Sequence, residues 1–118
     1  MTSYDFDLAL ARHTMWLSRL KLFTLGVGER DLTPEKAGDS GACELGAWLR
    51  GEGARYRDLP GFDALVEAHD RFHDLAAEVV RLHRLGDETE VRMLVEEVLP
   101  PASEDVALAL RKLRNLHL

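Results

Sequence analysis

The chain has 118 residues, 46% of them hydrophobic and 31% charged, and a formal net charge of −6. This length suits a single domain over residues 1–118 that buries a core without crosslinks, and the lone cysteine, Cys43, excludes an internal disulfide. A single cysteine without a secretory leader predicts a reducing, cytoplasmic location. No apolar run reaches the ~18 to 20 residues of a membrane span. The acidic balance argues against a nucleic-acid partner.

A first helix is predicted over residues 4–25, with Thr2 or Ser3 as its cap and glycines at 26 and 28 ending it. Its main apolar stripe steps by three and four: Phe6, Ala9, His13, Trp16, Leu20 and Phe23. A second apolar line, Leu8, Met15 and Leu22, lies beside the first. The helix is therefore apolar over more than half its circumference, and we expect its own bundle and a partner subunit to bury it.

Residues 26–41 are predicted to be a connector, with a helical turn at Thr33-Pro34-Glu35, where threonine caps and proline takes the first helical position. A short helix is expected over residues 42–50. Asp39 or Ser40 is the expected cap, because these residue types accept hydrogen bonds from free helix N–H groups.

Two further helices complete the prediction. The third runs from Pro60 over residues 60–85 on a stripe of Phe62, Val66, His69, His73, Ala76, Val80 and His83. The fourth runs over residues 88–116 behind a capping box of Asp87 and Glu90, and Pro100-Pro101 should kink it, with a true break as the alternative. The fold class is therefore all-α: a four-helix bundle with three long helices and one short helix that carries the cysteine.

Three histidines occupy apolar stripes of this bundle. His69 and His73, at i and i+4, lie one turn apart on one helical face, so their imidazoles can share a metal ion. His13 has the same setting on the first helix. A buried imidazole needs polar partners for both ring nitrogens, and one metal ion would satisfy three such rings together.

Cys43 is the expected fourth ligand. It is predicted in the first turn of the short helix, where free N–H groups and the helix dipole favour the thiolate that binds metals. Gly46 and Ala47 are expected on the same face, where small residues would let this helix approach the bundle. Three nitrogens and one sulfur suit tetrahedral zinc.

Other interpretations of these residues remain open at this stage. A lone histidine on an apolar stripe is more often a hydrogen-bonded core residue, and a lone buried cysteine is usually a small hydrophobe. A catalytic zinc with three histidines and a water ligand would need an acid/base carboxylate at motif-like spacing, which is missing. A di-iron bundle would need Glu-x-x-His pairs, but Val66 and Asp70 stand three residues before the two histidines. His83 lies about 15 Å along the helix from His73, too far to share its metal.

The motifs resemble those of the chemoreceptor zinc-binding domain, or CZB, family. They are His13-x-x-Trp16, then Cys43-Glu44-Leu45-Gly46-Ala47-Trp48, then His69-Asp70-Arg71-Phe72-His73, matching H-x-x-W, C-x-L-G-x-W and H-x-x-x-H in order. The resemblance implies a dimerising helical bundle with one zinc ion per subunit, held by His13, Cys43, His69 and His73. It also matches Asp39 to an acidic residue near the site.

The resemblance further implies a regulatory role rather than an enzymatic one. Such domains respond to zinc, or to oxidants such as hypochlorous acid that attack the zinc-bound thiolate, and they are usually attached to chemotaxis receptors or diguanylate cyclases. This chain lacks an attached output domain, so we expect a homodimer acting on a signalling protein in trans. The alternative is a structural zinc site that clamps the short helix in a scaffold or interaction protein.

Overall fold

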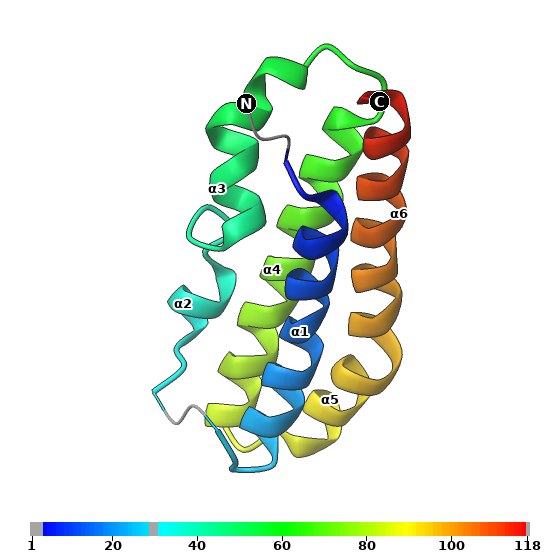
Figure 1. Ribbon diagram of the computed structural model, residues 1–118. Coiled ribbons are helices and arrows are strands. Elements are labelled where there is room, and N and C mark those ends of the chain that lie inside the picture. Colours follow the sequence, from blue (N-terminus) through cyan, green and yellow to red (C-terminus); the bar gives the residue numbers. More distant parts are fainter. Residues whose placement is uncertain (1–3, 29–30, 118) are drawn as a thin grey trace.

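The computed structural model describes residues 4–28 and 31–117. Residue 117 is described in its backbone only. Every regular element in these ranges is helical, as the sequence predicts. Figure 1 shows three long helical columns side by side: α1 (Phe6–Thr24), α4 (Phe62–Arg84) and α6 (Leu99–His117). The short helices α2 (Pro34–Gly38) and α3 (Glu44–Arg50) follow one another along one flank, and the start of α1 lies at the same end as the end of α6.

Helix α1 begins two residues later than expected, behind Asp5. The Asp5 carboxylate accepts a hydrogen bond from the backbone N–H of Leu8 at 2.9 Å, which satisfies a free donor of the first turn. The predicted caps Thr2 and Ser3 lie outside the described residues. At the other end Gly26 has φ +80°, the left-handed conformation that ends many helices.

The segment between α1 and α4 holds α2, α3 and the 3₁₀ turn η1 (Glu52–Tyr56). Thr33 caps α2 by accepting from the N–H of Lys36, with Pro34 at the first position, as predicted. The expected caps of α3, Asp39 and Ser40, were wrong. Cys43 itself is the cap, because its extended backbone (φ −78°, ψ 159°) aims the side chain back at the N–H of Gly46.

Helix α4 starts at Phe62 rather than at Pro60. Gly61 precedes it with φ +90°, a conformation that residues with a Cβ rarely adopt, so the helix cannot extend back through this position. Its buried stripe includes Phe62, His69, His73 and Val80, as the spacing predicts.

The last column is continuous through the two prolines. It consists of α5 (Glu88–Met93), the π-helical turn η2 (Leu94–Val98) and α6. The N–H of Leu99 bonds to the carbonyl of Leu94 five residues earlier, and both residues keep right-handed helical backbone. A π-turn widens the helix just before Pro100 and Pro101, which cannot donate to the previous turn. The alternative of a true break was therefore wrong.

The core lies between the three long columns. Its fully buried members come from every long helix and include Leu20, Leu65, Phe72, Leu99 and Leu113. Helix α3 joins this core at one end, where Trp48 stacks on Tyr4 with 4.1 Å between ring centroids. None of the helices in the described part of the chain is both long enough and apolar enough to cross a bilayer.

Candidate metal centre

The core face of α1 carries one buried histidine at its middle. His13 lies on the stripe that also buries Ala9 and Leu20, so its imidazole faces the interior. Its Nε2 atom is buried and has no hydrogen-bond partner among the residues that the structure describes. An orphaned buried nitrogen carries a free-energy cost of about 1 to 3 kcal/mol, which makes this position unusual for a purely structural residue.

Helix α4 places the rings of His69 and His73 beside the ring of His13. Their ring centroids are 4.7 Å apart, and each lies 5.0 to 5.5 Å from the ring of His13. The Nδ1–H of His73 donates to the carbonyl oxygen of Ala37 at 2.8 Å. This bond fixes the tautomer and aims Nε2 inward, where it is buried without a hydrogen-bond partner in the described part of the chain.

Cys43 reaches the three rings from the opposite side. Its sulfur is 3.0 Å from Nε2 of His69 and accepts from the N–H of Gly46 at 3.3 Å. Burial raises the pKa of the Cys43 thiol, and the N–H groups of Gly46 and Leu45 act in the opposite direction. The start of the helix therefore favours the thiolate, as expected, but burial has the larger effect on the pKa and favours the thiol. A bound cation would have to displace the thiol proton.

The four groups offer one ligand atom each, and all of these atoms lie within 4.8 Å of one another. Zinc bonds of ~2.0 to 2.3 Å separate the tetrahedral ligand atoms of such a site by about 3.3 to 3.6 Å, so small side-chain adjustments would close the site on one ion.

The histidines are held in the form that binds metals. Burial, reinforced by the neighbouring imidazoles, lowers the pKa of His13 to about 3 and that of His69 to about 4. Burial also lowers the pKa of His73. All three are neutral at physiological pH, and each can offer a nitrogen lone pair to a cation.

Comparison with known proteins agrees with this chemistry. Residues 13–80, more than half of the chain, match the family model of the chemoreceptor zinc-binding domain. The chain belongs to this family. No curated protein and no solved structure matches it. Zinc is therefore the cofactor that the family and the three-histidine, one-cysteine cluster indicate together.

Gly46 allows the short helix of this CZB domain to approach the cluster. A Cβ built there would lie 1.6 Å from the backbone oxygen of Ser40 and 3.1 Å from Cε1 of His69. Only glycine fits this position. Ala47, expected on the same face, is exposed, because the helix turns its next residue away from the bundle.

Polar contacts that sequence patterns did not reveal tie the ligand-bearing segments together. The Ser40 hydroxyl donates to Asp70 of α4 at 2.8 Å, and the Arg50 guanidinium donates to the same hydroxyl at 3.5 Å. Arg12 donates two bonds to the Glu44 carboxylate at 2.6 and 2.8 Å. Arg12, Glu44 and Asp70 each stand next to a ligand residue in the sequence, but only the tertiary fold brings these polar partners together.

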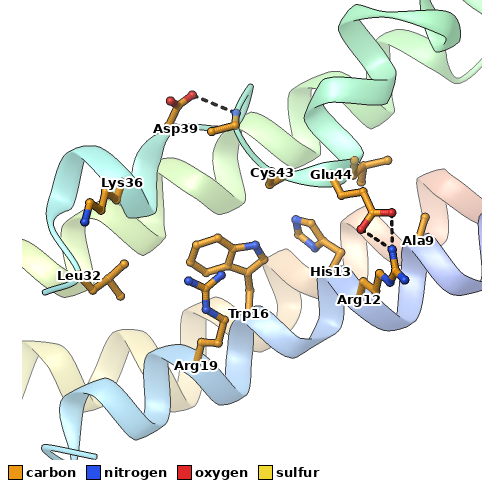
Figure 2. A pocket seen from close by; sticks show the side chains of 12 residues that line it. Ala9, Arg12, His13, Trp16, Arg19, Leu32, Lys36, Asp39, Cys43 and Glu44 are labelled. Atoms are coloured by element: carbon orange, nitrogen blue, oxygen red, sulfur yellow. Dashed lines mark hydrogen bonds and ion pairs between the residues drawn. The ribbon is translucent and has the colours of Figure 1, made fainter. Parts of the chain in front are cut away.

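A pocket of about 350 Å³ opens onto the cluster between α1 and residues 36–45 (Figure 2). Cys43 and His13 form part of its wall, with Trp16 beside them, so the pocket borders two of the four candidate ligand residues. Asp39 lines the rim, where its carboxylate accepts from the N–H of Ala42 at 3.2 Å. It stays outside the four-atom cluster.

His83 is separate from the cluster, as its distance along α4 predicts. Its Nδ1 lies 3.0 Å from the Glu88 carboxylate, and its ring packs on Phe23 with centroids 5.0 Å apart. This histidine lies where the end of α4 meets the start of α5.

Proposed function

We propose that His13, Cys43, His69 and His73 ligate one zinc ion, and that the chain is a single regulatory zinc-binding domain. We further propose that the fold is a four-helix bundle, in which α2 and α3 together form the fourth column beside α1, α4 and the last column. The observation that carries the metal assignment is the convergence of four ligand atoms from three separate segments. Two of these atoms are buried nitrogens without a hydrogen-bond partner within residues 4–28 and 31–117.

Zinc bound there would hold Cys43 as a thiolate and tie α3 to α1 and α4. The chain supplies the rest of the site. Ala37 orients His73 through its carbonyl, Ser40 and Asp70 fix the loop before Cys43, and Gly46 keeps the short helix close. This second layer holds each ligand atom near its bonding position before any ion arrives.

Two features favour a sensor over a structural clamp. The columns α1, α4 and α6 share a core whose fully buried residues lie mostly away from α3, so release of zinc should free one segment and leave the bundle folded. The pocket also borders Cys43, which would give oxidants a route to the sulfur. Hypochlorous acid would oxidise the thiolate by two electrons to the sulfenic acid and be reduced to chloride, which would weaken the site.

The test is zinc analysis of the purified full chain and of Cys43→Ala, with His83→Ala as a matched histidine control outside the cluster. We expect about one zinc ion per chain in the wild type and the control. In a competition titration with a chromophoric chelator, Cys43→Ala should bind zinc far more weakly. Wild-type affinity in Cys43→Ala would refute the ligand assignment.

The sensor and the structural clamp differ in what chelation does to the fold. For a sensor, helical circular dichroism should survive removal of zinc, while amide exchange should rise over residues 37–50. Collapse of the whole helical signal would instead favour the structural role. In the sensor case, the output would be read by a signalling protein such as a chemoreceptor or a diguanylate cyclase.

A further inference from the structure

A groove of about 330 Å³, which we call the end groove, lies between the last turn of α1 and the column formed by α5 and η2. This end of the bundle is opposite the start of α1 and the end of α6 (Figure 1). The residues that line the end groove are separate from the four of the metal cluster. The groove is therefore a second concave feature, which the zinc assignment does not use.

The end groove has an apolar floor and an apolar edge. Val91 and Val95 line it and are 2% and 7% exposed, whereas Leu25, also in its lining, is 75% exposed. The loops at this end also expose Val27 and Leu85, by 56% and 70% of their surfaces. Large apolar side chains that surround a preformed groove and stay in solvent indicate a contact site for another molecule.

Acidic residues surround this apolar site. The groove wall itself is balanced, with Lys21 and Arg92 beside Glu88 and Glu96. Arg92 stands four residues from each of these glutamates, a spacing at which opposite charges on a helix interact. The segment as a whole is strongly acidic, because residues 87–97 hold five acidic residues and one basic residue, all exposed: Asp87, Glu88, Glu90, Glu96, Glu97 and Arg92.

The prolines of the last column add hydrogen-bond acceptors beside the groove. A carbonyl in an α-helix normally accepts from the N–H four residues later. For Glu96 and Glu97 those later residues are Pro100 and Pro101, which have no N–H to donate. Two backbone carbonyls and the carboxylates of the same two exposed residues therefore make this side of the groove rich in acceptors.

We infer that the end groove binds an amphipathic helix of another protein, one with apolar side chains on one face and arginine or lysine on its flank. An arginine guanidinium suits the acceptors, because it carries five N–H donors and no acceptor. The apolar face of such a helix would fill the groove and cover Leu25. A helix is favoured over an added strand, because every regular element of the described ranges is helical and offers no strand edge.

The charge of this surface distinguishes the basic helix from other occupants. Two copies of the chain meeting here across a two-fold axis would bring residues 87–97 against the same segment of the partner subunit, and like charges would repel. Anionic lipid headgroups would be repelled in the same way. A basic helix is the occupant for which apolar contact and charge act together.

The inference rests on this surface alone and does not depend on zinc at the cluster. The probe is a labelled synthetic peptide with leucines on one helical face and arginines on the other, titrated with the full chain and followed by fluorescence anisotropy. Leu25→Asp should raise the dissociation constant about tenfold through loss of the apolar contact. Non-specific attraction would have the opposite effect, because the variant is one charge more acidic. Leu108→Asp adds the same charge at an exposed leucine of α6 and should not weaken binding.

The charge contribution is tested by a second matched pair. Glu96→Lys should weaken peptide binding about fivefold, whereas Glu67→Lys, the same change at an exposed position of α4, should have a smaller effect. Circular dichroism checks that all four variants fold.

Four results would each overturn the inference. They are a wild-type chain that does not bind the peptide, unchanged or tighter binding by Leu25→Asp, equal weakening by Glu96→Lys and Glu67→Lys, and equal affinity for a peptide with glutamate in place of arginine. Sedimentation velocity completes the test, because self-association that Leu25→Asp abolishes would assign the groove to a second copy of the chain and contradict the basic helix.

Discussion

Gly46→Ala is the substitution whose effect the structure specifies most sharply. The added Cβ would lie 1.6 Å from the backbone oxygen of Ser40, about 1.8 Å short of the 3.4 Å at which ordinary contact begins. A backbone oxygen cannot rotate away as a side chain can, so α3 must shift. Because Cys43 caps α3, the shift moves its sulfur away from His69.

Two losses follow from that shift. Overpacking of this kind costs about 1 to 3 kcal/mol of folding stability. Metal bonds tolerate roughly ±0.2 Å, so displacing the sulfur by more than 1 Å removes one ligand from the set. We expect zinc affinity to fall at least as much as the ~10- to 100-fold typical of lost supporting contacts.

The assay is a competition titration with a chromophoric zinc chelator, alongside thermal unfolding followed by circular dichroism. Ala47→Ser is the matched control, because it adds one atom at the adjacent, exposed position of α3 and should leave both quantities unchanged. Wild-type zinc affinity in Gly46→Ala would show that the close approach of α3 has no part in metal binding, and the argument from Gly46 would fail.

Three further predictions concern the same site. Oxidation with hypochlorous acid should release zinc from the wild type, whereas any zinc left on Cys43→Ala should resist, as followed by a zinc-sensitive dye; equal release would exclude the thiolate as the target. Asp70→Ala removes the acceptor for the Ser40 hydroxyl and should lower zinc affinity about tenfold, while Asp74→Ala, one turn along α4, should not. The metal-free protein should lose stability as pH falls from about 6.5 toward 3, in urea titrations at several pH values. The unfolded chain binds protons at His13 and His69 in that range and the native chain does not, since their native pKa values are about 3 and about 4. A flat profile would contradict the buried, neutral assignment.

Helical periodicity was enough to place the three histidines. His13, His69 and His73 share stripes with apolar residues, and a stripe that is buried must carry all its members inward. The same logic predicted Leu8, Met15 and Leu22 as a second line, which the structure leaves exposed.

The cap of α3 shows where the pattern fails. Cys43 was predicted inside the first turn because aspartate and serine are the usual caps and both stand just upstream. In the fold, the Asp39 carboxylate accepts a hydrogen bond from the N–H of Ala42, and the Ser40 hydroxyl donates to Asp70. Local preference was overridden by contacts between segments 30 residues apart, which a single sequence does not reveal.

The prolines of the last helix illustrate a different limit. The sequence fits both a kinked helix and a break. The apolar stripe from Val95 to Leu113 keeps its helical phase, which favours a kinked helix, whereas Pro100 and Pro101 favour a break. The fold resolves the conflict with a π-turn over Leu94–Val98, ahead of the residues that lack donors. Such a turn depends on packing against the other helices and leaves no mark in the apolar spacing.

Zinc K-edge X-ray absorption on the purified full chain tests the ligand set most directly. Three imidazole nitrogens at ~2.0 to 2.1 Å and one sulfur at ~2.3 Å are expected, with the sulfur signal absent from whatever zinc Cys43→Ala retains. A wild-type spectrum with only nitrogen and oxygen neighbours, or the same sulfur signal in the variant, would contradict convergence of these four side chains on one ion.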